Sequence, residues 1–309
     1  MTTDKPSNLP ASVRQRLLNL SRTRREDFNL LLARYAIERC LYRLSRTRHG
    51  DQFVLKGAML FGVWTDEFHR PTKDLDLLAF GDPSAERLHD VFADICAVDV
   101  EHDGLVYQKE TIRITEIRED DEYRGHRVEL QATLGKMRIS LQVDVGFGDT
   151  VGLEEPGRYP TLLSFRPPLI RMYPKEYVIS EKLQAMVALE ERNSRMKDFY
   201  DLWFMSNRFP FEGVALRNAI YRTFERRKTP LPATLPVALS ALFSESPLKI
   251  TQWEAFLKRL RLEAGESLGE VVGKIGEFLM PALTAAARGE PFDYCWPPGG
   301  PWRKREGDG

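Results

Sequence analysis

The sequence predicts an α+β fold with N-terminal helices, a mixed sheet in the middle and a helical C-terminal half. Apolar residues recur at helical spacing over residues 10–46 and again after Pro174. Between these regions, short segments alternate apolar and polar residues, as strands do when one face of a sheet is buried. The chain has 309 residues, of which 42% are hydrophobic, so it has enough apolar material for a large core.

Residues 1–50 are expected to form basic helices after a frayed polar start at residues 1–9. The arginines of this part are Arg14, Arg16, Arg22, Arg24, Arg25, Arg34, Arg39, Arg43, Arg46 and Arg48. With 11 basic and 4 acidic residues, the segment has a net charge of +7. The arginines form either a solvated helical face or a basic surface for the phosphates of RNA or DNA, and the sequence leaves both interpretations open.

Residues 51–172 are expected to form the sheet. The predicted strands and helices are strands at 53–55, 74–80, 105–118, 126–134 and 137–147, and helices at 58–65 and 84–97. Turns are expected at residues 124–125 and 135–136, where a glycine stands beside a basic residue. Residues 51–150 carry 11 basic and 21 acidic side chains, so this part of the chain is strongly acidic.

Residues 173–290 are expected to form a helical domain, followed by a tail at residues 291–309 that is rich in proline, glycine and tryptophan. The predicted helices cover residues 175–191, 197–207, 212–227, 234–244, 250–263 and 267–288. Prolines stand between several of these segments. Because a proline ends or interrupts a helix, they mark the expected helix boundaries.

Composition excludes several classes of protein. No apolar run approaches the roughly 18 to 20 residues that span a bilayer, and the polar N-terminus lacks the apolar core of a secretory signal. We therefore expect a cytoplasmic protein with no membrane partner. Cys40, Cys96 and Cys295 are far apart and the histidines are scattered, which argues against a disulfide framework and a histidine metal site.

Two aspartates, Asp74 and Asp76, stand in an alternating strand pattern. Residues two apart in a strand project to the same side, so the two carboxylates are expected to lie together. Neighbouring carboxylates repel each other unless a cation lies between them, and oxygen ligands suit Mg²⁺ or Mn²⁺. The alternative is that both aspartates simply belong to the polar face of a surface strand.

A third carboxylate is expected on the same side of the sheet. Asp144 stands between Val143 and Val145 in a predicted strand, so it faces away from the core if the valines face into it. Beside Asp74 and Asp76 it would complete a cluster for two metal ions, which stabilise the attacking and leaving oxygens of a phosphoryl transfer.

The order of Gly57, the strand with Asp74 and Asp76, and Asp144 resembles the nucleotidyltransferase superfamily typified by polymerase β. The residue after Gly57 is Ala58, where that superfamily has Gly or Ser, and the spacer to Asp74 is longer. Further segments are similar to motifs of the AbiEii/AbiGii toxin branch, which includes the mycobacterial MenT-like toxins. They are FVLKG at 53–57, RPTKDLDL at 70–77, EKLQA at 181–185 and RMKDFYDL at 195–202, and together they span about half of the chain.

The resemblance implies a polymerase-β-like sheet and the toxin half of a type IV toxin–antitoxin or phage-defence system. It implies a metal-dependent enzyme that transfers a nucleoside monophosphate from an NTP to the 3′ acceptor end of tRNA, and so blocks translation and growth. Mg²⁺ or Mn²⁺ is the expected cofactor. The expected partners are tRNA and a cognate AbiEi-like antitoxin, a winged-helix DNA-binding protein.

The resemblance also implies roles for individual residues. Asp74, Asp76 and Asp144 would bind metal, Asp144 would help to activate the attacking hydroxyl, and Lys182 would neutralise the triphosphate with Asp198 beside it. The nucleotide-binding residues would be Lys56, Gly57, Thr72, Lys182 and Arg195. From the residues alone, Lys182 also fits a snorkelling lysine and Asp198 a helix cap. Asp201 is expected to be a structural hydrogen-bonding partner.

Two other kinds of function stay open. The same fold could transfer a nucleotide to a protein hydroxyl or to a small molecule such as an aminoglycoside, although the N-terminal arginines disfavour a cationic acceptor. An alternative from another class is a non-catalytic protein that uses the carboxylates only to bind an antitoxin.

Overall fold

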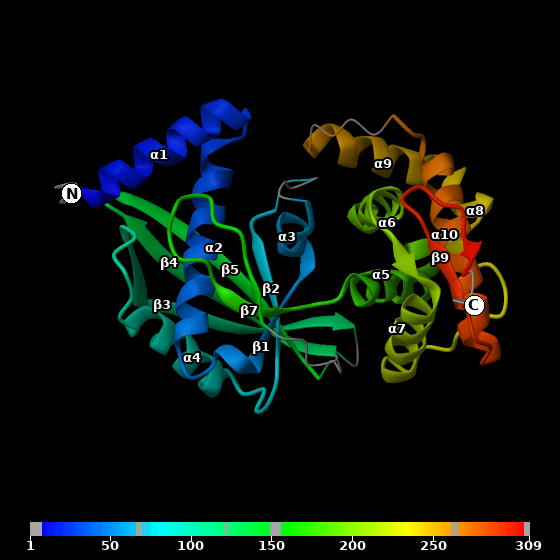
Figure 1. Ribbon diagram of the computed structural model, residues 1–309, viewed down its shortest axis with the longest axis horizontal. Coiled ribbons are helices and arrows are strands. Elements are labelled where there is room, and N and C mark those ends of the chain that lie inside the picture. The colour runs from blue at the N-terminus through cyan, green and yellow to red at the C-terminus, as the bar shows by residue number, and fades with distance from the viewer. Residues whose placement is uncertain are drawn as a thin grey trace. The chain divides into compact units, whose positions relative to one another are not determined.

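The chain divides into two compact units, Met1–Tyr173 and Pro174–Gly309 (Figure 1). The computed structural model describes residues 8–65, 70, 72–120, 123–148, 156–260, 262 and 265–305. The predicted polar start, up to residue 7, and the last residues of the predicted tail, 306–309, lie outside the described residues, as does Pro71 of the aspartate motif.

The N-terminal region consists of two helices, α1 (Leu9–Arg24) and α2 (Phe28–Arg46). Asp27 caps the start of the second helix, because its carboxylate accepts a hydrogen bond from the Leu30 N–H at 3.0 Å. Between residues 31 and 44, α2 is buried at nearly every position, because it packs against the sheet, α1 and α4 (Ala85–Ala97). It is therefore a core helix of this unit.

A mixed sheet forms the centre of the first unit, as the sequence predicts, and it has seven strands where the sequence predicts five. The strands in chain order are β1 (Phe53–Lys56), β2 (Asp74–Ala79), β3 (Leu105–Asp120), β4 (Tyr123–Leu134), β5 (Met137–Phe147), β6 (Gly157–Arg158) and β7 (Leu169–Met172), and the short helices are η1 (Gly50–Gln52), η2 (Gly57–Leu60) and α3 (Phe61–Thr65). The spatial order is β3-β4-β5-β2-β1-β7-β6. The pairs β2/β5 and β1/β7 are parallel, and the other neighbours are antiparallel.

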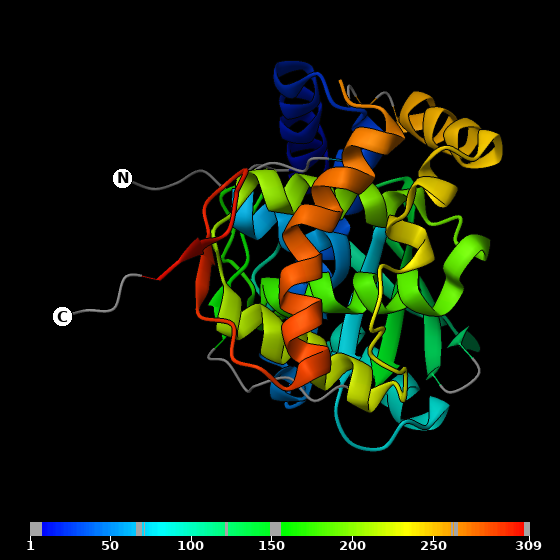
Figure 2. The same cartoon turned by 90° about the vertical axis from the view of Figure 1, so that its right-hand side faces the viewer.

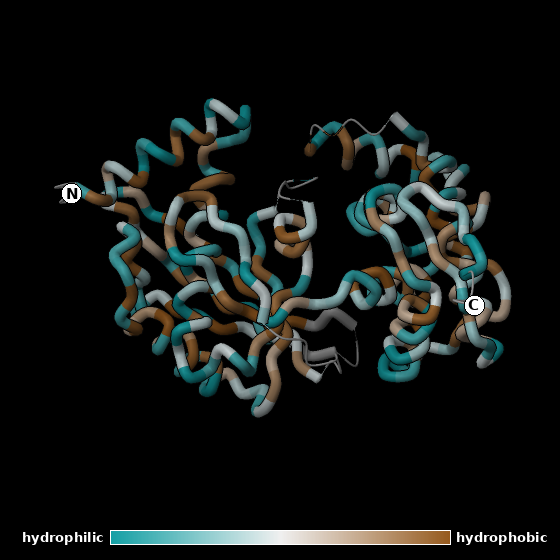
Figure 3. The backbone as a smooth tube through the Cα atoms, viewed as in Figure 1, coloured by the Kyte–Doolittle hydropathy of each residue, from teal (hydrophilic) through white to brown (hydrophobic). Residues whose placement is uncertain are grey.

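The two faces of the sheet differ in polarity. Along β5, Ile139, Leu141, Val143 and Val145 are buried, and the residues between them are half-buried or exposed. In Figure 3, hydrophobic (brown) and hydrophilic (teal) stretches alternate along the backbone of this unit. The helices α2 and α4 lie against the sheet and cover its apolar face (Figure 1). The opposite face therefore carries the polar side chains of β2, β4 and β5.

One local prediction in this unit is wrong, and two short strands escape the sequence pattern. Residues 124–125 do not form a turn but lie inside β4, where Gly125 pairs with Gly146 of β5. The connection between β3 and β4 falls at residues 121–122, outside the described residues. The strands β6 and β7 were not predicted, because segments this short leave no alternating pattern to recognise. The turn at residues 135–136 is confirmed.

The second unit is mainly helical, as predicted. Its helices are α5 (Lys175–Leu189), η3 (Glu190–Arg192), α6 (Met196–Arg208), α7 (Gly213–Arg226), η4 (Val237–Leu239), α8 (Ala241–Ser244), α9 (Pro247–Leu260) and α10 (Leu268–Arg288). Figure 2 shows α10, in orange, as the long helix in the foreground, and it packs against α6 and α7. The helix predicted at 234–244 is wrong, since Pro236 interrupts it and leaves only η4 and α8. Within the described part of the chain, none of the helices combines the length and apolar character that crossing a membrane requires.

The C-terminal residues pack back onto the second unit. The strand β9 (Tyr294–Trp296) pairs with β8 (Phe211–Glu212) and with β10 (Arg303–Lys304) to form a three-stranded sheet. Trp296 is 1% exposed, and its Nε1 donates a hydrogen bond to the Ser206 carbonyl at 2.7 Å. The described part of the predicted tail is therefore built into this unit.

Candidate active site

The polar face of the sheet brings the three predicted aspartates together. In the parallel pairing of β2 with β5, Asp76 stands directly opposite Asp144 and Asp74 stands opposite Gln142. Paired residues on neighbouring strands project to the same face, and so do residues two apart in one strand. Asp74, Asp76 and Asp144 therefore share one face, opposite the buried valines that flank Asp144.

Gly57 determines where the Asp76 carboxylate can lie. On the other side of β2, the antiparallel strand β1 places Lys56 opposite Asp76, and Gly57 follows at once with a positive φ of 68°. A Cβ atom at Gly57 would fall 1.9 Å from Asp76 Oδ2. Any side chain at position 57 would thus displace the carboxylate. Position 57 therefore requires glycine for two reasons, the positive φ and the close approach of Asp76.

The remaining predicted residues of this unit lie close to these strands. Asp74 is exposed and Asp76 is half-buried. Thr72 is buried two residues before β2 begins. The Lys56 ammonium lies 4.9 Å from the centre of the Tyr173 ring. The structure thus places Thr72 and Lys56 near the aspartates of β2.

Arg127 is a charged residue of this face that the sequence interpretation missed. It stands on β4 directly opposite Asp144, and its Nε and Nη2 donate to Asp144 Oδ1 and Oδ2, both at 2.8 Å. Hydrogen bonding to Asp144 raises the pKa of Arg127, which stays fully charged. One row of paired residues therefore runs Lys56, Asp76, Asp144, Arg127 across four strands, with the two cations at its ends.

The expected cluster of three metal-binding carboxylates is not closed. Among the residues that the structure describes, no group of three Asp, Glu, His or Cys side chains converges on a metal position. The Arg127 guanidinium binds both oxygens of Asp144. Asp74 and Asp76 nevertheless fit a divalent cation, because both offer oxygen ligands on one side of β2.

In the second unit, Lys182 lies between two carboxylates. Its ammonium on α5 is 2.6 Å from Asp198 Oδ1 and 2.9 Å from Asp201 Oδ2, both on α6. The side chains are 16%, 6% and 0% exposed, in that order, so the ammonium does not snorkel into solvent. The Asp198 carboxylate binds Lys182, and among the described residues no α6 N–H donates to it, so it does not act as the expected helix cap. Asp201, expected only as a structural partner, belongs to the same ion-pair group.

Arg195 lies where α6 begins. It is the residue before the helix, its N–H is bound to the Asn193 side chain at 2.9 Å, and its own side chain is half-buried. The segment RMKDFYDL at 195–202 therefore forms the first turns of α6. Asp198 and Asp201 lie one turn apart on the side of this helix that faces α5.

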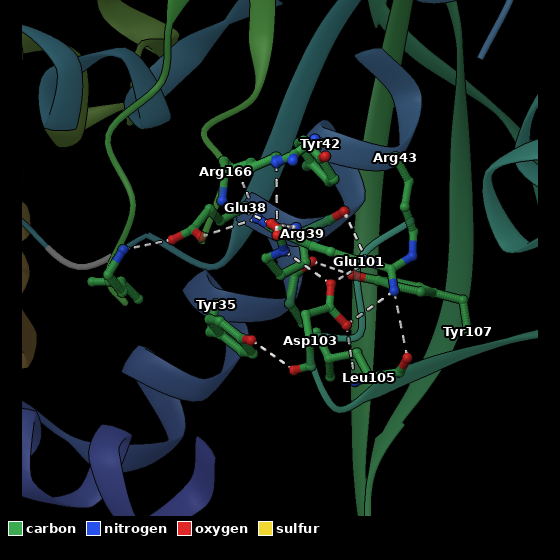
Figure 4. Close-up of polar contacts among 12 residues, drawn as sticks. Tyr35, Glu38, Arg39, Tyr42, Arg43, Glu101, Asp103, Leu105, Tyr107 and Arg166 are labelled. Carbon is green, nitrogen blue, oxygen red and sulfur yellow. Dashed lines mark hydrogen bonds and ion pairs between the residues drawn. The ribbon is translucent and has the colours of Figure 1, made fainter. Parts of the chain in front are cut away.

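The N-terminal arginines do not all form a basic surface. Arg34, Arg39 and Arg43 are buried in α2, so for these three both interpretations, a solvated face and a surface for phosphates, are wrong. Figure 4 shows Arg39 and Arg43 directed at Asp103, with Arg39 Nε 2.9 Å from Oδ2 and Arg43 Nη2 3.0 Å from Oδ1. Because α2 lies in the core, the guanidinium groups of Arg39 and Arg43 bind Asp103 and cannot bind phosphate. The exposed arginines of this region are Arg14, Arg22, Arg24, Arg25, Arg46 and Arg48.

Burial and hydrogen bonding have opposite effects on the carboxylates of this network. Although burial opposes the shift, hydrogen bonds from Arg43 and Arg39 hold the pKa of Asp103 below its ordinary value. For Glu38, burial raises the pKa to about 8, and the hydrogen bond from the Leu162 N–H at 2.7 Å only partly opposes it. This network stabilises the fold on the apolar side of the sheet, away from the row that contains Asp76.

Comparison with known proteins identifies one matching family model. The model described as "Nucleotidyl transferase AbiEii toxin, Type IV TA system" matches residues 39–282. No protein with a curated description matches the chain. Among solved structures, the nucleotidyltransferase toxin MenT4 from Mycobacterium tuberculosis H37Rv is similar, with 16% identity, 90% of this chain and 98% of that chain covered and a TM-score of 0.48. JHP933 from Helicobacter pylori is similar with 14% identity, coverages of 81% and 90% and a TM-score of 0.44.

Proposed function

The chain belongs to the AbiEii family of nucleotidyltransferase toxins of type IV toxin–antitoxin systems, and from this we propose that it transfers a nucleoside monophosphate from an NTP to the 3′ acceptor end of tRNA. The observation that carries the proposal is the pairing of Asp76 with Asp144, with Asp74 on the same face. A modified acceptor end cannot be aminoacylated, so the transfer would stop translation and growth.

The two aspartates of β2 are the proposed metal ligands. A Mg²⁺ or Mn²⁺ ion held there would neutralise the phosphate oxygens of the NTP. Gly57 keeps the Asp76 carboxylate in place, because any side chain there would collide with it. Lys56, opposite Asp76, adds a positive charge on the β1 side, where we propose that the triphosphate lies, with Gly57 and Thr72 beside it.

Asp144 is the proposed partner of the attacking hydroxyl. Its carboxylate is 21% exposed, and two hydrogen bonds from Arg127 fix its orientation. A carboxylate held in this way would accept a hydrogen bond from the acceptor hydroxyl and orient it for attack, and positioning of this kind supplies much of the catalysis in phosphoryl transfer.

For Lys182 we propose a phosphate-binding role. Asp198 and Asp201 hold the ammonium in a fixed position, and a fixed ammonium binds phosphate at a lower entropic cost than a mobile one. Arg195, half-buried before α6, is the second phosphate contact that we propose in this unit. The exposed N-terminal arginines would hold the RNA backbone.

The partner that the family implies is an antitoxin, and we propose that it is an AbiEi-like winged-helix protein acting in the cytoplasm. The enzymatic proposal is tested first with the purified wild-type protein, total tRNA and each of the four labelled NTPs, in Mg²⁺ and in Mn²⁺. We expect label in the tRNA fraction with at least one NTP. Label in protein alone would move the acceptor to a protein hydroxyl, and no label anywhere would exclude the transfer.

A further inference from the structure

An irregular segment of β3 lies beside the proposed active site. The pairing of β3 with β4 runs regularly to Gln108 opposite Gln131 and resumes at Arg113 opposite Glu129. Residues 109–112 therefore stand opposite Leu130 alone. Such a bulge bends a strand and redirects its side chains, and bulges of this kind are common next to active sites.

Thr111 fixes the bulge in one conformation. Its hydroxyl accepts a hydrogen bond from the Gln131 N–H at 2.9 Å, which the distorted ladder would otherwise leave without a partner on β3. The same hydroxyl donates to the Gln108 carbonyl at 2.6 Å. The Thr111 hydroxyl thus takes the place of the β3 carbonyl that would pair with the Gln131 N–H in a regular ladder, and the bulge stays hydrogen-bonded to the sheet.

The bulge forms one wall of a pocket of about 500 Å³ on the polar face of the sheet. Its lining includes Lys73, Asp74, Thr111, Arg113, Glu129 and Gln142. Asp74 is thus shared between this pocket and the proposed metal site. The volume is within the range of small-molecule sites, roughly 300 to 1,000 Å³.

The lining has the chemistry for a sugar and a phosphate. Lys73 and Arg113 are exposed cations that attract phosphate, and the carboxylate of Glu129 and the amide of Gln142 pair with hydroxyl groups. Among the described residues that line the pocket, none is aromatic, so nothing here stacks on a base. The pocket therefore suits the backbone of a nucleotide better than its base.

The two sides of β2 offer different groups. On one side, β1 contributes Lys56 and the Gly57 turn, and on the other side, β5, β4 and β3 contribute the pocket. An in-line phosphoryl transfer needs its attacking and leaving oxygens on opposite sides of the transferred phosphorus. If the triphosphate lies on the β1 side, the acceptor must approach from the pocket side.

We propose that this pocket binds the terminal ribose and phosphate of the acceptor RNA, with Arg113 on the phosphate and Glu129 on the ribose hydroxyls. This inference rests on the proposed function, since it assigns the acceptor half of the same site. It adds a binding site and the chemical group that the site recognises.

The test compares Arg113→Ala with Arg138→Ala in the full chain. Both arginines are exposed and lie on strands of this sheet, but Arg138 does not line the pocket. We expect Arg113→Ala to raise the KM for tRNA about tenfold, the loss of one charge-assisted hydrogen bond, and to leave the KM for NTP unchanged. Arg138→Ala should change neither. A rise in the KM for NTP, or equal effects of the two variants, would overturn the proposal.

A second measurement is independent of catalysis. Fluorescence anisotropy gives the affinity for an acceptor-stem RNA that ends in an ordinary or a 2′-deoxy nucleotide. The wild type should bind the 2′-deoxy RNA several-fold more weakly, and Glu129→Ala should bind both equally. If the wild type transfers no nucleotide, the proposed function fails, and the pocket is judged by this binding alone. Equal binding of the two RNAs by the wild type would then overturn the pocket assignment.

Discussion

The Arg127 guanidinium donates to both carboxylate oxygens of Asp144, with Nε and Nη2 each 2.8 Å away. Asp144 is directly opposite Asp76, so the guanidinium lies one strand beyond the paired aspartates. It places a positive charge directly beside the Asp144 carboxylate. We therefore propose that Arg127 is a positioning residue for the acceptor side of the proposed site.

Replacing Arg127 by methionine should lower kcat for nucleotide transfer by about a hundredfold, because Asp144 loses its fixed orientation. Lysine at this position should restore part of the rate, since it keeps the charge but not the paired hydrogen bonds. The KM for NTP should stay near that of the wild type. The control is Arg138→Met. Arg138 is on β5, is exposed, and has no carboxylate partner among the described residues. Equal rates for Arg127→Met and Arg138→Met would contradict the positioning role.

Gly57→Ala should abolish transfer and destabilise the fold by about 1 to 2 kcal/mol, because the new Cβ collides with the Asp76 carboxylate and φ is positive. Gly146→Ala is the matched control, since the atom nearest to its Cβ would be the Leu77 carbonyl oxygen at 4.0 Å. The transfer assay and urea denaturation measure the two effects. An active Gly57→Ala enzyme would show that Asp76 does not need its observed position.

Lys182→Met should lower the free energy of unfolding by about 3 to 5 kcal/mol, because it removes the ammonium that two buried carboxylates share. Lys258→Met, at an exposed position of α9, should cost less than about 0.5 kcal/mol. Urea denaturation of the full chain compares the two variants. Similar costs would mean that the Lys182 ion pairs contribute little to stability.

Glu38 should make stability fall as pH rises. Burial raises the pKa of Glu38 from 4.5 to about 8, so the folded protein binds a proton that the unfolded chain releases between these values. The free energy of unfolding should decrease across this window, by at most about 1.4 kcal/mol per pH unit from this group. Glu38→Gln should remove that slope and be more stable than the wild type at pH 8, whereas Glu245→Gln, an exposed control, should not. Parallel pH profiles of wild type and Glu38→Gln would contradict the assignment.

Sequence alone predicts that the three aspartates of the proposed site share one face, because their signal is local. The alternation of β2 puts Asp74 and Asp76 on one side, and the valines around Asp144 fix the side to which it points. The motif segments then predict the family, which the family model confirms over residues 39–282.

Sequence alone could not identify Arg127 or the burial of Arg39 and Arg43. Arg127 matters only through the register of β4 against β5, which no local pattern specifies. The arginines of α2 look like a solvated face until Asp103, far along the chain, is seen to meet them inside the core. The β3 bulge and the short strands β6, β7 and β9 also depend on partners distant in sequence.

The central claim is that Asp76 is part of a nucleotide-transfer site, and the most direct measurement is the transfer of label from NTP to tRNA by wild type, Asp76→Asn and Asp90→Asn. Asp90 is an exposed aspartate of α4 and serves as the isosteric control. We predict that Asp90→Asn matches the wild type and that Asp76→Asn is slower by about a hundredfold to a thousandfold, the usual cost of losing one electrostatic contact to the transition state. Transfer by Asp76→Asn at the wild-type rate would contradict the claim.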